Sequence, residues 1–199
     1  PGQRPGKYCQ SLFRFSLKQP IMIDWHKEVN TTKLVQTMTV ARTGEQQKQL
    51  LRFFLENNYE VLAQRGHSYW RRSQLLLPLR RIRAEETGGK SILESGISRC
   101  ISLGSCGGLK LYSDLHQLFA KDVALVATTG SGLMQTNNRF NRRLPELIAE
   151  NHGLRTWPEI MTQPEIQKIF NETGAEDYLL PGSLVPLLYR NHFLSIKQP

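Results

Sequence analysis

The stretch RCISLGSCGG (residues 99–108) places a cysteine, Cys106, among small residues directly after an apolar run. The run itself, RCISLG, is short and apolar enough to be a strand in the middle of a sheet. The glycines around the thiol, Gly104, Gly107 and Gly108, permit a tight turn and let another backbone approach closely. A cysteine in this position is presented in the open, so its role decides most of what the sequence predicts about function.

Strand and helix patterns alternate on both sides of this stretch. β-Branched and apolar residues predict three more strands, at LVQTMTV (residues 34–40), YEVLAQRG (59–66) and VALVATT (123–129). Helical spacing predicts helices at TGEQQKQLLRFFLENN (43–58), LKLYSDLHQLFAKD (109–122) and RFNRRLPELIAENHG (139–153). Because strands that alternate with helices pair in parallel, we expect an α/β fold with a mostly parallel sheet flanked by helices on both faces.

The N-terminal part of the chain is different in character. Residues 1–33 carry several prolines and no sustained period, so we interpret them as an N-terminal extension or linker, and residues 34–199 as the α/β domain. The chain has 199 residues, 39% of them hydrophobic, which is enough to bury a core without disulfides. Its start, PGQRPGKYCQ, lacks an initiator Met and the apolar core of a signal peptide, so we expect a processed or excised piece.

The number and spacing of the cysteines indicate the redox compartment and the cofactors to expect. Three cysteines, Cys9, Cys100 and Cys106, are few and odd in number, which argues against a disulfide framework and favours a reducing compartment such as the cytoplasm. None of them pairs with a nearby histidine at a familiar metal-ligand spacing, so we expect no metal and no other cofactor. No apolar run approaches the roughly 20 residues that span a bilayer, so we expect no transmembrane segment.

The chain is strongly basic, with a formal net charge of +9 and a pI of about 9.7. Basic residues crowd one segment: Arg65, Arg71, Arg72, Arg80, Arg81 and Arg83. No nucleic-acid-binding motif accompanies the charge, which argues against nucleic acid as a partner. The pattern favours a solvated arginine-rich face, with an acidic protein partner as the other interpretation.

Two side chains that could take part in catalysis directly follow predicted strands. His67 comes after the strand predicted at residues 59–66, and Cys106 comes after RCISLG. In open α/β sheets, ligands bind in the crevice outside the carboxyl ends of the strands. If these two strands are neighbours, both side chains emerge at the same edge of the sheet.

A Cys–His pair at that edge is suited to attack on a carbonyl group. A thiol attacks as the thiolate, and a nearby imidazole favours that form and manages the proton of the leaving group. The negative charge that develops on the carbonyl oxygen needs donors, and the backbone N–H groups of Cys106 and around Ser68 are candidates. The sequence therefore predicts nucleophilic catalysis by Cys106 with His67.

Two blocks of the chain resemble those of the caspase-like clan of cysteine peptidases, which includes clostripain, gingipains, legumain and separase. In that clan, an apolar strand ends in a histidine followed by a small residue, and a later apolar strand ends in a small residue and the cysteine. YEVLAQRGHS (residues 59–68) resembles the first block and CISLGSCGG (100–108) the second, in the same order. VALVATTGSG (123–132) resembles the next core strand.

The resemblance implies a caspase-like three-layer sandwich and a cysteine endopeptidase, a hydrolase that acts on a protein or peptide substrate through a Cys–His dyad. It makes Cys106 the nucleophile and His67 the general base and acid. The other site residues that we expect around the oxyanion and substrate pocket are Gly66, Ser68, Ser105 and Gly107. The clan commonly has glycine at the position of Ser68 and often alanine at that of Ser105.

Two other functions stay open at this point. GSCGG also fits the G-x-C-x-G nucleophile elbow of glutamine amidotransferases and related hydrolases, whose histidine comes later in the chain. The later histidines here are His116, His152 and His192. The second alternative is a catalytically inactive caspase-like domain that uses its basic surface to hold a partner.

The glycine-containing stretch TTGSG (residues 128–132) follows the strand predicted at 123–129. It lacks the lysine and the full spacing of a phosphate-binding loop. Since its strand ends at the same edge of the sheet, we expect it to form a wall of the cleft.

Overall fold

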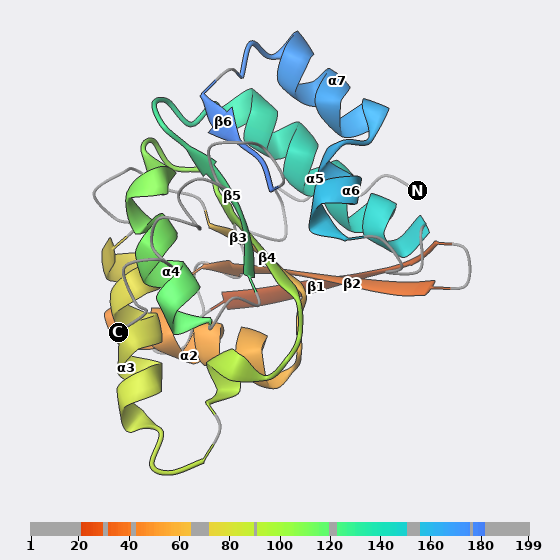
Figure 1. Cartoon of the computed structure of the whole chain (residues 1–199). Helices are drawn as coiled ribbons and strands as arrows, with labels where there is room; N and C mark the ends of the chain where they lie inside the picture. Colours follow the sequence, from red (N-terminus) through yellow and green to blue (C-terminus); the bar gives the residue numbers. More distant parts are fainter. Residues whose placement is uncertain are drawn as a thin grey trace.

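A computed structural model describes the chain over residues 21–29, 32–40, 43–64, 72–89, 91–119, 123–150, 156–175 and 177–181. Within these ranges a four-stranded sheet, flanked by helices, forms the body, and a separate two-stranded hairpin lies beside it (Figure 1).

The sheet has the strand order β3-β4-β5-β6. Strands β3 (Val61–Gln64), β4 (Arg99–Leu103) and β5 (Val123–Thr128) are parallel, and the short edge strand β6 (Tyr178–Leu179) runs antiparallel to β5. All five residues of β4 are buried, as expected for a central strand. The predicted α/β class with a mostly parallel sheet is confirmed.

One face of the sheet is covered by α2 (Gly44–Glu56), α3 (Leu77–Glu85) and α4 (Tyr112–Leu118) (Figure 1). Leu55 of α2, Leu79 of α3 and Leu115 of α4 are fully buried there against Ile101 and Leu103 of β4 in one core cluster. Since right-handed crossovers lead from β3 to β4 and on to β5 in one direction, α3 and α4 fall on the same face.

The other face is covered by α5 (Met134–Glu150), α6 (Trp157–Met161) and α7 (Pro164–Glu172). Phe140 and Phe170 pack there with a ring-centroid distance of 5.4 Å, over Cys100 of β4 and Val126 of β5. Side chains that alternate along β4 thus enter two separate cores. The predicted arrangement of helices on both faces is therefore confirmed.

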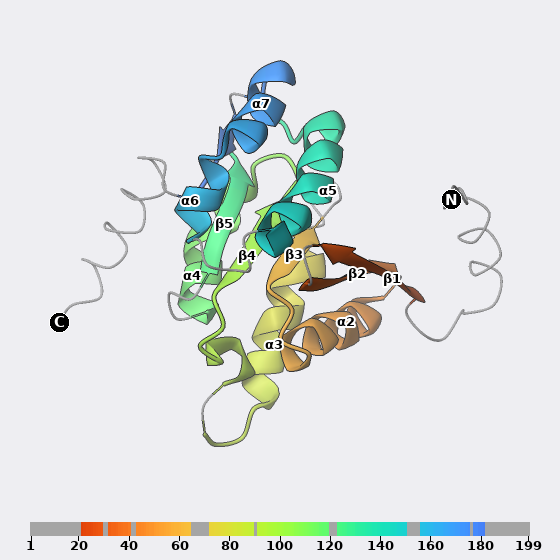
Figure 2. The same ribbon diagram turned by 90° about the vertical axis from the view of Figure 1, so that its right-hand side faces the viewer.

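The N-terminal hairpin pairs β1 (Ile21–Val29) with β2 (Thr32–Val40) antiparallel, and both strands contact α5 (Figure 2). The strand predicted at residues 34–40 is confirmed as part of β2, but it does not join the main sheet. Its partner β1 lies within the residues interpreted as an extension, so the hairpin crosses the predicted boundary after residue 33.

Local signals place the ends of two helices. Thr43 caps α2 by accepting a hydrogen bond from the Gln46 amide at 3.2 Å, in line with helix-capping preferences. Pro78 occupies the first turn of α3, directly after a short π-helical turn, η1 (Arg72–Leu76). A proline is tolerated in the first turn of a helix, where its fixed φ suits the helical backbone.

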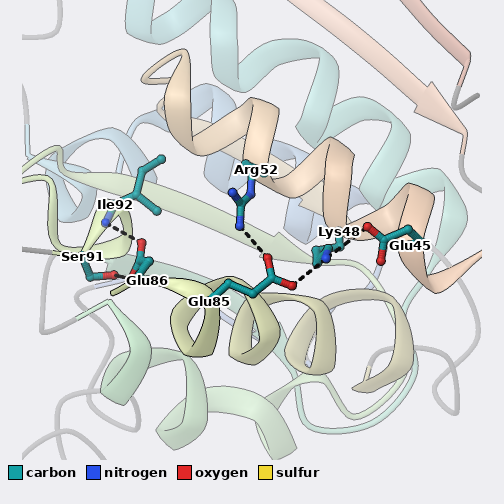
Figure 3. Close-up of polar contacts among 7 residues, drawn as sticks. All are labelled: Glu45, Lys48, Arg52, Glu85, Glu86, Ser91 and Ile92. Atoms are coloured by element: carbon teal, nitrogen blue, oxygen red, sulfur yellow. Dashed lines mark hydrogen bonds and ion pairs between the residues drawn. The ribbon is translucent and has the colours of Figure 1, made fainter. Parts of the chain in front are cut away.

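Ion pairs join α2 to α3 on the outer surface of the first face (Figure 3). The Glu85 carboxylate accepts hydrogen bonds from Lys48 and Arg52, each at 2.7 Å. The hydrogen bond from Lys48 lowers the pKa of Glu85 and, in turn, raises that of Lys48. Glu86, the residue after Glu85, accepts hydrogen bonds from the Ser91 hydroxyl and from the Ile92 amide. These bonds stabilise the connection between α3 and β4.

The burial of Cys100 predicts a pH-dependent stability. Burial raises the pKa of the Cys100 thiol from 9.0 to about 12, so above pH 9 this thiol ionises in the unfolded chain before it does in the folded one. The free energy of unfolding therefore does not depend on this thiol's ionisation below pH 9, and it falls as the pH rises toward 12. We expect Cys100→Ala to remove that loss, which amounts to about 1.4 kcal/mol per pH unit above pH 9.

The measurement is the free energy of urea unfolding at a series of pH values for wild type and Cys100→Ala. Cys106→Ala is the matched control: Cys106 is exposed, so this substitution removes no buried thiol, and the variant should lose stability above pH 9 as wild type does. Equal pH dependence in wild type and Cys100→Ala would contradict the burial of this thiol.

Candidate functional site at the carboxyl edge of the sheet

The carboxyl ends of the three parallel strands lie side by side. Gln64, the last residue of β3, pairs with Leu103, the last residue of β4, and Ser102 pairs with Val126 of β5. The Gly104 amide continues this ladder by donating to the Gln64 carbonyl at 3.1 Å. Strands β3 and β4 are therefore neighbours, which is the condition under which we expected His67 and Cys106 to emerge at the same edge. Gly66, His67 and Ser68 lie outside the described residues.

Cys106 lies in the turn after β4 and its side chain is exposed. The Gly132 amide donates a hydrogen bond to Cys106 Sγ at 3.3 Å. This amide belongs to the stretch 128–132, which the sequence predicted as a wall of the cleft, and the structure places it against the thiol. A backbone N–H directed at sulfur stabilises negative charge on it.

The two loops on either side of the thiol are bonded to each other. Gly107, in the left-handed conformation at φ 63°, donates its N–H to the Gly130 carbonyl at 2.8 Å. The buried Thr128 hydroxyl donates to the Ser105 carbonyl at 2.8 Å and accepts from the Gly108 amide at 3.3 Å. Hydrogen bonds within the chain thus hold the backbone on both sides of Cys106 in one arrangement.

Ser105, one of the predicted pocket residues, is turned inward. Its side chain is only 1% exposed, and its hydroxyl has no hydrogen-bond partner. Of this residue, only the backbone carbonyl is engaged at the edge of the sheet, where it receives the Thr128 hydroxyl. Gly107 contributes its left-handed backbone and the amide that joins the two loops.

The backbone at Cys106 differs from a nucleophile elbow, in which the nucleophile itself occupies a strained turn. The left-handed residue here is Gly107, and the non-glycine residue with a positive φ in the described part of the chain is Asn58. His116 lies near the end of α4, which runs back toward the opposite edge of the sheet, and its ring packs on Tyr112 at 4.5 Å. His152 and His192 lie outside the described residues.

The arginine-rich segment is engaged with acidic side chains where the structure describes it. Arg80 pairs with Asp114 of α4 at 2.6 Å, and Arg83 pairs with Glu94 at 2.7 Å. The described residues carry about as many acidic as basic side chains, so the surplus positive charge of the chain falls on the others. These pairs support the interpretation of α3 as an ion-paired, solvated face.

Sequence reasoning missed three residues that hold this edge together. Asp177 accepts a hydrogen bond from the Ser131 amide at 3.1 Å, and Asn137 and Tyr178 bond to the backbone beside the thiol. Asn137 lies on α5, Asp177 directly precedes β6, and Tyr178 is the first residue of β6. Since β6 is only two residues long, the local sequence pattern could not predict its position.

Comparisons with known proteins find no relative of this chain: no family model, no curated protein and no solved structure matches it. Among the described residues, no group of three His, Cys, Asp or Glu side chains is arranged to hold a metal ion. None of the helices in the described ranges is long and apolar enough to cross a membrane.

Gly132 is predicted to tolerate no side chain. A Cβ at this position would overlap the Gly104 carbonyl oxygen and come within 3.1 Å of the Ser105 backbone, neither of which can swing aside. We expect Gly132→Ala to push the two loops apart and to cost about 1–3 kcal/mol of stability, as overpacked sites do.

Gly44→Ala is the matched control, because the nearest atom to a Cβ there is the flexible end of Arg81, at 3.9 Å. Thermal unfolding of the two variants compares them directly. A Gly132→Ala protein as stable as Gly44→Ala would contradict the close approach of the loops.

Ser105→Ala should be neutral or stabilising. The substitution removes a buried hydroxyl that makes no hydrogen bond, so it relieves a desolvation cost of up to about 1 kcal/mol and sacrifices no partner. Thr128→Val, which removes a buried hydroxyl bonded to Ser105, should lower the free energy of urea unfolding by about 1 kcal/mol or more. A loss in Ser105→Ala as large as that in Thr128→Val would refute the assignment of Ser105 as unbonded.

Proposed function

We propose that this chain is a cysteine peptidase of the caspase-like type, in which Cys106 is the nucleophile and His67 the general base and acid. One observation carries the proposal. Gln64 and Leu103 are paired neighbours at the ends of β3 and β4, and His67 and Cys106 each follow three residues later. Equal offsets from a paired position in parallel strands favour side chains that meet at the same edge.

The environment of the thiol supports a nucleophilic role over a packing role. Cys100, the other described cysteine, is buried in an apolar core where ionisation is disfavoured. Cys106 is exposed and receives a backbone amide on its sulfur. Reactive cysteines occupy exposed, polar surroundings of this kind, whereas buried ones are inert.

In the proposed reaction, the Cys106 thiolate attacks the carbonyl carbon of a peptide bond, so that a C–S bond forms and the carbonyl oxygen becomes negative. Backbone amides at Cys106 and around Ser68 would hold that charge. The C–N bond then breaks as His67 gives its proton to the leaving amine, which leaves a thioester on Cys106. Water, deprotonated by His67, hydrolyses the thioester and restores the thiolate.

The loops around the thiol suit an extended substrate backbone. In the sequence, Gly66 directly precedes His67 and Gly107 directly follows Cys106, and neither carries a side chain that could obstruct a peptide. The stretch 128–132 forms one wall, held against Cys106 through Gly132. A protein or peptide is therefore the substrate class that we propose.

Cleavage of a mixed peptide library by wild type, Cys106→Ala and His67→Ala tests the proposal. We expect both substitutions to lower the rate by a factor of about 10³ or more, because each removes one member of the dyad. Cys100→Ala is the matched control and should retain activity, since this thiol is buried away from the edge. Circular dichroism confirms that each variant is folded.

Two outcomes would contradict the dyad. Cleavage that survives His67→Ala would remove the histidine from the mechanism. An absence of cleavage by folded wild type, together with alkylation of Cys106 no faster than that of a free thiol, would favour the inactive binding domain.

A further inference from the structure

A chain of hydrogen bonds runs beneath Cys106 from one flanking loop to the other. It begins at the Leu133 amide, which donates to the Tyr178 hydroxyl at 2.8 Å. The hydroxyl donates to Asn137 Oδ1 at 2.9 Å, and Asn137 Nδ2 donates to the Gly104 carbonyl at 2.9 Å. The Leu133 carbonyl also lies 3.3 Å from the Tyr178 hydroxyl, but Asn137 Oδ1 is the nearer acceptor for its single proton. Because the Gly104 carbonyl can only accept, Asn137 presents Nδ2 to Gly104 and Oδ1 to Tyr178.

The two ends of this chain flank the thiol. Gly104 precedes Cys106 by two residues, and Leu133 directly follows Gly132, whose amide contacts Cys106 Sγ. Asn137 and Tyr178 are 4% and 9% exposed, so their bonds are shielded from water. Hydrogen bonds in such surroundings are stronger than those at the surface and hold their partners in one geometry.

The Gly104 carbonyl is the point where the loops come closest. A Cβ on Gly132 would overlap its oxygen, and a Cβ on Gly104 would overlap the Asn137 amide. Asn137 therefore sets the distance between the turn that carries Cys106 and the loop that carries the Gly132 amide. A shift of either end would lengthen the 3.3 Å contact at sulfur.

We propose that Asn137 and Tyr178 are positioning residues for Cys106: their hydrogen-bonded pair holds the Gly132 amide against the sulfur. The inference rests on the proposed function, since it treats Cys106 as the nucleophile. Neither residue contacts the sulfur itself in the bonds described, and both act through the backbone of the flanking loops. Their role is to keep the thiol in the orientation and the polar surroundings from which it attacks.

The test compares Tyr178→Phe with Thr136→Val. Tyr178→Phe removes the hydroxyl from the chain and leaves the ring packed on Phe170. Thr136→Val is the matched control, because the fully buried Thr136 hydroxyl donates to the Thr173 hydroxyl at 2.8 Å and takes no part in the chain. Each variant removes one buried hydroxyl from the same side of the sheet: Tyr178→Phe loses the bonds to Leu133 and Asn137, and Thr136→Val loses the bond to Thr173. Both should lower the melting temperature, which is measured beside the alkylation rate so that any general loss of stability is accounted for.

The readout is the rate constant for alkylation of Cys106 by iodoacetamide, followed site by site with mass spectrometry over a range of pH. We expect Tyr178→Phe to slow alkylation at neutral pH by about three- to tenfold and to shift its pH profile upward, because a hydrogen bond to the thiolate is weakened. Thr136→Val should stay within about twofold of wild type. Asn137→Ala, a second variant, should slow alkylation at least as much as Tyr178→Phe.

Alkylation rates that follow the melting temperatures, with Thr136→Val slowed as much as Tyr178→Phe, would overturn the positioning role. Unchanged rates in both Tyr178→Phe and Asn137→Ala would overturn it as well. Alkylation needs no peptide substrate, so this result is independent of the proposed peptidase activity. Where the library is cleaved, the same variants should lower kcat more than they change KM.

Discussion

The in-register parallel pairing of β3 with β4 is the constraint on which the rest of the structure depends. It places Gln64 opposite Leu103, so the segments that carry His67 and Cys106 in the sequence both leave the sheet from the same point of its edge. A slip of one residue would turn Ile101 and Leu103 away from the core that they share with α2, α3 and α4. Packing on that face therefore fixes the register, and the register fixes the loops.

The edge is held by hydrogen bonds from the strands and from the second face of the sheet. From the strands themselves, Thr128 ties the turn after β4 to β5. From the second face, Asn137 on α5 and Tyr178 on β6 reach the backbone on both sides of the thiol. An exposed sulfur thus stands on a buried hydrogen-bonded support, an arrangement that suits the nucleophilic role proposed for Cys106.

Local patterns were sufficient to predict most of the elements and the edge where the site lies. The short apolar run of β4, the alternation in β2 and the capped periodicity of α2 are each decided by neighbours in sequence. Such local patterns could not predict contacts between residues that lie far apart in the sequence. Nothing local indicated that β1 would pair with β2, or that Tyr178 would bond to Asn137, 41 residues earlier. Ser105 was expected at the pocket, yet its side chain fills the interior.

His67 and Cys106 act as a pair in the proposed peptidase. One comparison tests this pairing most directly: the rate of Cys106 alkylation at about pH 6 in wild type and in His67→Ala. A nearby imidazolium maintains the thiolate below neutral pH, so we predict alkylation at least about tenfold slower in the variant. At about pH 10, where thiols ionise without help, the two rates should converge. Equal rates at pH 6 would contradict the pairing on which the proposed peptidase rests.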